Sequence, residues 1–273
     1  MSLTSAMGTG VSGLLANGEA VSVIGNNLAN INTIGFKQGR TLFSDMLSSQ
    51  INNGQIGRGG QIQAVQNMFG QGSLETTGSA TDLAIQGDAM FVVQDPNASA
   101  GQFFTRAGAF TFDKNQVLTN PDGYKVLGYS ITGGVPAAAL STIDLTTVTP
   151  PAGPPVPTIV KIAVNDKGVM SALYSDGTPV EIFQVALAKF PSTNGLDKTG
   201  GSLFAQTSAS GTPIIDQTSF EGNKVISNSL EQSNVDMAEQ LVKMITTQRA
   251  YTANSKTITA SDQMIQDTLN IVR

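Results

Sequence analysis

Apolar residues recur every seven positions at both ends of this 273-residue chain. Such a repeat places side chains along one face of a helix, and that face needs a partner. The C-terminal repeat predicts a helix from about residue 234 to 271. The repeat comprises Leu230, Met237, Met244, Tyr251, Ile258, Ile265 and Val272. A second stripe of the same helix face is expected through Leu241 and Leu269, and its other positions are Gln248, Ser255 and Asp262. The N-terminal repeat comprises Met7, Leu14, Val21 and Leu28, with Ile24 and Ile31 three positions further on.

The two predicted helices differ in intrinsic strength. Residues 233–236 read Ser-Asn-Val-Asp, which fits a capping pattern that starts a helix and places the cap at Ser233. The N-terminal helix contains five glycines, each costing about 1 kcal/mol relative to alanine in a helix interior. These glycines are Gly8, Gly10, Gly13, Gly18 and Gly25. We therefore expect this helix to order only when something packs on it, either the other helix or helices of neighbouring copies.

The middle of the chain, residues 73–229, has the pattern of an antiparallel β structure. Short apolar runs alternate with turn sequences such as Asn-Pro-Asp-Gly at 120–123 and Ser-Asp-Gly at 175–177. A Pro-rich connection lies at 149–157. The predicted fold class is α+β: long coiled-coil-like helices at the N- and C-termini flank a mainly antiparallel β body. An ordinary amphipathic helix on a core is the alternative for each terminal helix.

Composition excludes several functional classes. The net charge is −5 and no basic run exists, so the chain lacks the positive surface that nucleic-acid binding requires. It contains no cysteine and no histidine, which removes the commonest metal ligands and the commonest general base. No apolar run is long enough to span a bilayer, and no cleavable signal sequence is recognisable.

Catalytic and cofactor patterns are weak. Residues 8–13 match G-x-G-x-x-G, but a dinucleotide site requires a preceding strand, and only seven residues come before the motif. The acidic residues cluster at turns, where they can bond to their own backbone; these are Asp113, Asp122, Asp166 and Asp176. We therefore expect no catalytic activity, no metal and no cofactor. A secreted β-rich enzyme remains an alternative class.

Charged residues make up only 13% of the chain, about half the usual share. A surface with so little charge lacks the self-repulsion that keeps proteins apart, which suits a subunit that packs against its own copies. A fibrous adhesin or a phage tail component would share this property.

Two motif blocks carry a resemblance. One is Asn26, Asn27 and Asn30 with Gly35, Phe36 and Lys37; the other covers residues 233–242 and 248–251. With residues 82–91, 105–112 and 120–124 of the β body, they resemble the rod and hook family of bacterial flagellar axial proteins. The likeness fades near Pro150. Within the family, the stretch 43–47, the short Gly-rich 57–60 and residues 124–129 with Gly128-Tyr129 are most like hook proteins. Distal rod proteins are the alternative, since the outer β domain common in hooks has no counterpart here.

The resemblance implies a structural subunit of the flagellum that is exported through the type III apparatus without a cleaved signal. It implies a homopolymer in the form of a helical tube, with other axial proteins, the hook cap and the export apparatus as partners. Residues 1–35 with 230–273 would form the inner tube, 36–72 an extended linker, and 73–229 the outer β body. The residues expected at subunit contacts are Met7, Leu14, Val21, Ile24, Leu28, Ile31, Met237, Leu241, Met244, Tyr251, Ile258 and Ile265.

Overall fold

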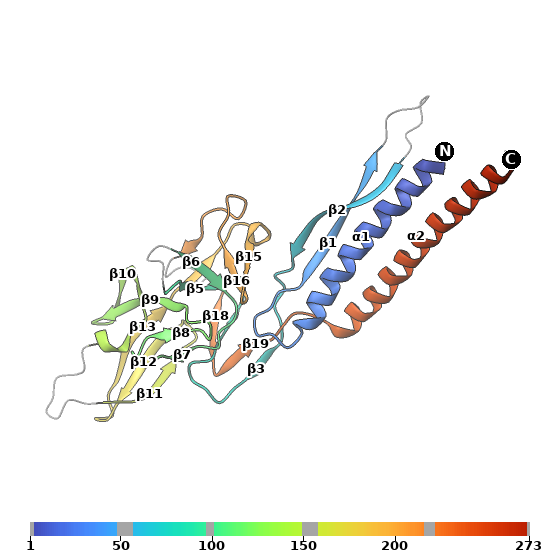
Figure 1. Cartoon of the computed structure of the whole chain (residues 1–273). Coiled ribbons are helices and arrows are strands. Elements are labelled where there is room, and N and C mark those ends of the chain that lie inside the picture. Colours follow the sequence, from blue (N-terminus) through green and yellow to red (C-terminus); the bar gives the residue numbers. More distant parts are fainter. Residues whose placement is uncertain (1–2, 48–56, 97–100, 149–157, 216–221, 272–273) are drawn as a thin grey trace. The chain divides into compact units, whose positions relative to one another are not determined.

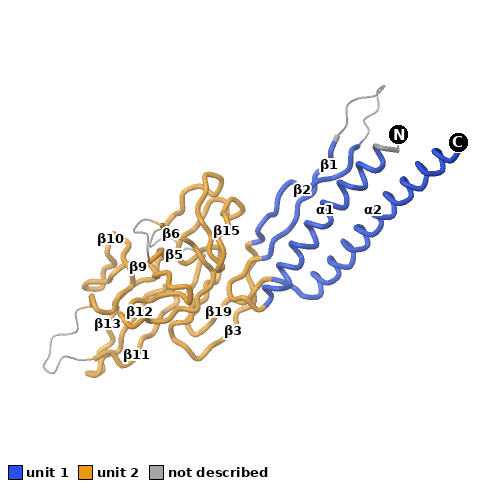
Figure 2. Tube along the Cα trace, in the orientation of Figure 1, with its two compact units in different colours: residues 1–31, 38–68, 235–273 blue, residues 32–37, 69–234 orange. Residues whose placement is uncertain are grey.

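The computed structural model describes residues 3–47, 57–96, 101–148, 158–215 and 222–271. The chain forms two compact units (Figure 2). Residues 1–31, 38–68 and 235–273 make up the first unit, and residues 32–37 and 69–234 make up the second. The Pro-rich connection expected at 149–157 lies outside the described residues. Each unit is described by itself.

The first unit contains two long helices and a β-hairpin (Figure 1). Helix α1 spans Leu3–Ala29 and helix α2 spans Met237–Ile271. The two helices pack antiparallel, since Gly10 of α1 lies at Ile258 whereas Asn27 bonds to Gln240. Strands β1 (Gly39–Leu47) and β2 (Gly57–Asn67) pair antiparallel, and both contact α1.

The hairpin differs from the sequence expectation. Residues 36–72 read as an extended linker, but β1 and β2 pair from Gly39 with Asn67 to Leu47 with Gly57. The register shifts twice along this pairing, which weakens the alternation by which a strand is recognised from sequence. The hairpin therefore belongs to the same compact unit as the helices.

The start of α2 also differs from the expectation. Asp236, and not Ser233, caps the helix: its Oδ1 accepts a hydrogen bond of 3.1 Å from the backbone N–H of Glu239. Its carbonyl accepts the first helical bond, from the N–H of Gln240. A short acidic side chain satisfies an otherwise unpaired N–H and favours the positive end of the helix dipole. The helix thus begins one turn later than the capping pattern suggested.

The second unit is a β structure in which every described strand pairing is antiparallel. Its main sheet follows the order β11-β12-β13-β9-β5-β6-β16-β15, while β18 pairs with β4 and β19 pairs with β3. The strands are β3 (Leu74–Thr76), β4 (Leu83–Gln86), β5 (Met90–Gln94), β6 (Gln102–Thr105), β7 (Thr111–Phe112), β8 (Leu118–Thr119), β9 (Lys125–Thr132), β10 (Val135–Thr142), β11 (Ile159–Val164), β12 (Val169–Tyr174), β13 (Pro179–Val185), β14 (Leu187–Lys189), β15 (Asp197–Gly200), β16 (Leu203–Ala205), β17 (Ile214–Ile215), β18 (Lys224–Ser227) and β19 (Ser229–Glu231).

Two apolar clusters form the core of the second unit. Alternate residues of β5 divide between them: Phe91 and Val93 enter one cluster, and Met90 and Val92 enter the other. The strand is therefore buried on both faces, which explains why it reads as a continuous apolar run. Edge-to-face rings strengthen each cluster, Phe91 with Phe110 in the first and Phe104 with Phe190 in the second.

The turn chemistry read from the sequence is confirmed. Asn165 Oδ1 accepts hydrogen bonds from the backbone N–H groups of Lys167 and Val169. Gly168 and Gly177 have positive φ angles of 69° and 83°, which glycine adopts without strain. Within the described residues, neither helix is both long enough and apolar enough to cross a membrane.

Candidate assembly site

The contact between α1 and α2 depends on glycine. A Cβ added to Gly10 would lie 2.9 Å from Ile258 Cγ1, and one added to Gly13 would lie 2.5 Å from Asn254 Nδ2. Both distances are shorter than real Cβ atoms show, so a side chain at either position would require Ile258 or Asn254 to move. Two of the five glycines that weaken α1 as an isolated helix thus lie at its contact with α2.

The expected contact residues of α1 lie on or beside the covered faces of the helix. Ile24 is buried, and the others are half-buried, namely Met7, Leu14, Val21, Leu28 and, just after the helix, Ile31. The most deeply buried apolar residues of the helix are Ala16, Ala20 and Ile24. Small side chains predominate because α1 is contacted both by α2 and by the hairpin.

The expected contact residues of α2 divide into two groups. Met244, Ile258 and Ile265 are half-buried, whereas Met237, Leu241 and Tyr251 are exposed. A second stripe of buried and half-buried residues runs along α2, three positions after members of the apolar repeat. Leu241 and Leu269 lie four positions after members of the repeat, so they are not part of this stripe. It consists of polar residues that the apolar pattern passed over: Gln240, Thr247, Asn254 and Ser261. Contacts of any of these residues with neighbouring subunits stay a prediction.

A buried amide network joins α1, the start of β1 and α2. Asn27 Oδ1 accepts a 2.8 Å bond from the N–H of Gly39, and its Nδ2 donates a 2.8 Å bond to the carbonyl of Gly39. The same Nδ2 lies 3.3 Å from Gln240 Oε1, and Gln240 Nε2 donates to Gln38 Oε1 at 3.0 Å. Gln240 is only 1% exposed, so these bonds satisfy amide groups that would be costly to bury alone.

The other motif residues also have structural roles. Asn30 Nδ2 donates to the carbonyl and the Oδ1 of Asn26, at 2.9 and 2.7 Å, at the end of α1. In the second unit, Gly35 has a φ of +66° and lies so close to the Arg106–Ala107 backbone that no Cβ fits. Phe36 is buried, with Lys198 Nζ 3.7 Å above the centre of its ring.

A buried ion cluster in the second unit was not foreseen from the sequence. Glu231 Oε1 lies 2.6 Å from Lys37 Nζ, and Glu231 Oε2 lies 3.2 Å from the Arg106 guanidinium. The side chains of Lys37 and Glu231 are fully buried. The N–H of Gly72 also donates to Glu231, at 2.9 Å. Burial lowers the pKa of Lys37, the nearby carboxylate opposes that effect, and the Arg106 charge adds to it.

The cluster holds together the segments through which the chain enters and leaves the second unit. Glu231 also accepts, through its backbone carbonyl, the N–H of Gly35 at 2.7 Å. Lys37 donates to the carbonyl of Gly70 at 2.8 Å, and Asn234 Nδ2 donates to the same carbonyl at 3.0 Å. Residues 32–37, 69–72 and 231–234 are thereby tied to one another by a single carboxylate and its neighbours.

Helix α2 carries many exposed apolar side chains. They are Met237, Leu241, Val242, Ile245, Tyr251, Met264, Leu269 and Ile271. On α1, Val11 and Leu15 are exposed as well. So many large apolar side chains in contact with water favour a surface that another protein covers.

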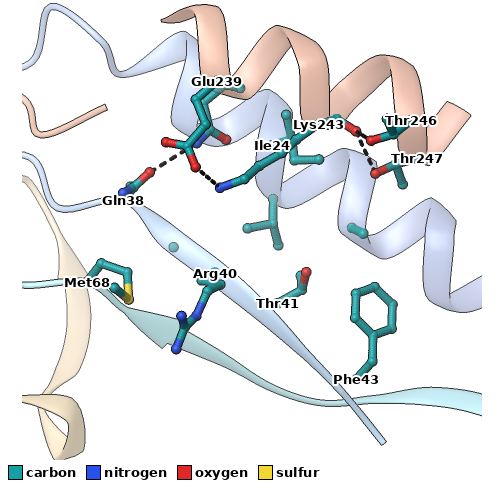
Figure 3. Close-up of a pocket in the computed structure, with 14 residues that line it drawn as sticks. Ile24, Gln38, Arg40, Thr41, Phe43, Met68, Glu239, Lys243, Thr246 and Thr247 are labelled. Atoms are coloured by element: carbon teal, nitrogen blue, oxygen red, sulfur yellow. Dashed lines mark hydrogen bonds and ion pairs between the residues drawn. The ribbon is translucent and has the colours of Figure 1, made fainter. Parts of the chain in front are cut away.

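A groove of about 350 Å³ lies within the first unit (Figure 3). Its apolar lining comes from α1 with Val23 and Ile24, and from the hairpin side with Phe43 and Met68. Lys243 of α2 lies along the groove and pairs with Glu239 at 2.7 Å. Within the described part of the chain, no group of three or more His, Cys, Asp or Glu residues is placed to hold a metal ion.

Three family descriptions match successive parts of the chain. "Flagella basal body rod protein" matches residues 7–37, "Flagellar hook protein FlgE/F/G D1 domain" matches residues 84–172, and "Flagellar basal body rod FlgEFG protein C-terminal" matches residues 226–271. The first match covers most of α1 with the Asn-rich motif, and the third covers all of α2.

Whole-length relatives agree with these matches. The flagellar basal-body rod protein FlgG of Bacillus subtilis is 32% identical over 280 residues, which covers 97% of this chain and 98% of that protein. FlgG of Borreliella burgdorferi is 32% identical over 284 residues, with 98% of both chains covered. The flagellar hook protein FlgE of Brucella suis is 25% identical over 399 aligned residues, with both chains fully covered. The chain therefore belongs to the rod and hook family of structural proteins of the bacterial flagellum.

Proposed function

We propose that the chain is a subunit of the distal rod of the flagellar basal body, where it polymerises into a tube. The observation that carries this proposal is the match with the rod protein FlgG at 32% identity over 97% of this chain and 98% of that relative. The match with the hook protein is weaker, at 25%, and its alignment of 399 residues far exceeds the length of this chain. That hook protein therefore carries many residues with no counterpart here.

This proposal reverses the order favoured by the sequence resemblance, which put the hook first and the distal rod second. The hook-like features were short, namely residues 43–47, 57–60 and 124–129, and residues 48–56 lie outside the described structure. Agreement along the whole chain carries more weight than three short stretches.

The exposed surface of the first unit supports a role in assembly. Tyr251 is 44% exposed and Leu269 is 65% exposed on α2, and Leu15 is 72% exposed on α1. In a tube, neighbouring copies would cover these side chains, at roughly 25 cal/mol per Å² of apolar area removed from water. The other rod proteins, the hook and the export apparatus would be further partners. A cysteine-free chain with a weak first helix suits export in an unfolded state.

Deletion of the gene in the bacterium that encodes it tests this function. We expect basal bodies isolated from the deletion strain to lack the distal part of the rod and, in consequence, the hook. Electron microscopy of these basal bodies gives the answer directly. A complete rod without a hook would assign the chain to the hook, and intact flagella would exclude both roles.

A further inference from the structure

Among the described residues, α2 extends further than α1 at one end of the helix pair. Because α1 and α2 are antiparallel and Gly10 faces Ile258, Leu3 at the start of α1 lies level with about residue 265 of α2. Helix α2 continues to Ile271, which is about 9 Å further at 1.5 Å per residue. We call residues 264–271 the overhang. Most of its last two turns therefore lies beyond the described start of α1.

The overhang is apolar and acidic. Met264 is 55% exposed, Leu269 is 65% exposed and Ile271 is 82% exposed, so three large apolar side chains face water at one helix end. Asp267 lies within the overhang, and Asp262 lies just before it. A helix end of this kind is costly to leave in water and matches an apolar groove with a positive rim.

The groove of Figure 3 has these complementary properties. Its apolar lining residues include Val23, Ile24, Met68 and Phe43, and Phe43 is 53% exposed. Its charged lining residues are Arg40, Lys243 and Glu239, so it carries one net positive charge against Asp267 of the overhang and Asp262 just before it. Lys243 and Glu239 pair with each other, whereas none of the ion pairs found among the described residues includes Arg40.

A chain cannot fill its own groove. Thr247 lines the groove, and Leu269 lies 22 residues further along the same straight helix, which is about 33 Å at 1.5 Å per residue. The groove and the overhang therefore lie far apart along one rigid element of the first unit. Two different complementary surfaces at separate places on one molecule produce a head-to-tail contact, which builds an open helical filament when the rotation between copies does not close into a ring.

We propose that the overhang of one copy inserts into the groove of the next copy, with Leu269 and Ile271 on the apolar lining and Asp267 toward Arg40. The occupant of the groove is thus a second copy of this chain. This inference rests on the proposed polymer and specifies one of its contacts. The remaining exposed apolar residues of α2 stay available for other neighbours.

The absence of cysteine from the chain allows a direct test by disulfide trapping. The bacterium would carry Phe43→Cys with Leu269→Cys in place of the native gene. A disulfide requires Cα atoms about 4.4–6.8 Å apart, so the two positions cannot bond within one chain. Isolated basal bodies would be oxidised and analysed on a non-reducing gel. We expect a ladder of covalent multimers of this chain that disappears on reduction and is absent from either single variant.

A second pair of cysteine substitutions and a control pair distinguish the proposed contact from a local effect of one substitution. Met68→Cys with Ile271→Cys probes the same contact through different side chains, and a ladder from either pair supports the proposal. Ser255→Cys with Leu269→Cys is the matched control, because Ser255 is exposed on α2 and does not line the groove. An equal ladder from this control would overturn the proposed contact. The same holds if both groove pairs assemble into normal rods without a ladder, and in either case the proposed rod function would stand. A wild-type chain that is absent from the rod would instead overturn the function.

Discussion

Replacement of Glu231 by glutamine removes the only negative charge from a buried cluster that holds two cations. Lys37 and Glu231 are fully buried and Arg106 is 2% exposed, so no solvent replaces the lost charge. Loss of one partner of a buried ion pair costs about 3–5 kcal/mol. For a unit of this size each kcal/mol lowers the melting temperature by about 2–4 °C, so we expect a fall of about 6–20 °C for the second unit.

Lys37→Met is the informative comparison. It leaves Arg106 paired with Glu231, and the carbonyl of Gly70 keeps its bond from Asn234. The remaining cluster is neutral, so this substitution should cost no more than about 1–2 kcal/mol, the range for a lost hydrogen bond. Glu239→Gln serves as the control: it breaks an exposed ion pair with Lys243 in the first unit, so the unfolding of the second unit should not change.

Urea unfolding followed by tyrosine fluorescence measures these differences. Three of the four tyrosines, Tyr124, Tyr129 and Tyr174, lie in the second unit and no tryptophan obscures them. The expected order of destabilisation is Glu231→Gln, then Lys37→Met, then Glu239→Gln. A Glu231→Gln variant that loses less than about 1 kcal/mol, or a Lys37→Met variant that loses as much as Glu231→Gln, would refute the argument from buried charge.

Three further predictions concern pH, helix contact and assembly. Burial lowers the pKa of Lys37, so between the folded pKa and 10.5 the unfolded chain binds more protons than the folded chain. The free energy of unfolding should therefore rise with pH in that window, and Lys37→Met should flatten the rise when it is measured by urea titration. Gly13→Val should separate the helices and lower their protection in hydrogen exchange, since its Cβ would lie 2.5 Å from Asn254. Gly8→Ala should instead stabilise α1 by up to about 1 kcal/mol, because nothing lies within 4 Å of the added Cβ. Equal effects of the two substitutions would contradict the role given to Gly13. Tyr251→Asp and Ile258→Asp should both prevent polymerisation as seen by electron microscopy, and calorimetry should show the larger loss of helix-pair stability for Ile258→Asp, because Ile258 is half-buried against Gly10 whereas Tyr251 is 44% exposed and its Cε2 would lie 4.0 Å from a Cβ at Gly18. A Tyr251→Asp chain that polymerises normally would remove this residue from the subunit contact.

The sequence predicted the elements with strong periodicity. The C-terminal helix was expected at about 234–271 and spans Met237–Ile271, because a seven-residue repeat sustained over five heptads has few other interpretations. The turns at Asn165 and Asp176 were equally clear, since both side chains bond to their own turn backbone. The hairpin was missed because its two register shifts break the alternation of polar and apolar residues.

The polar stripe of α2 and the buried ion cluster could not be predicted from the sequence, for two different reasons. A seven-residue repeat allows a second stripe three or four positions on, and a preference for apolar residues selects Leu241 over Gln240. The structure places Gln240 inside because Asn27 supplies it with a hydrogen-bonding partner. Glu231 and Lys37 are 194 residues apart in the sequence, and no local pattern pairs a lysine with a glutamate at that separation.

A cryo-electron microscopy map of basal bodies from the encoding bacterium, resolved to side chains, would show which protein builds the distal rod. We predict that the rod segment next to the hook is built from this chain, with α1 and α2 packed at Gly10 and Gly13 in every copy and with a neighbour's Leu269 in each groove. A map in which this chain forms the hook, or in which the segment next to the hook consists of another protein, would contradict the assignment.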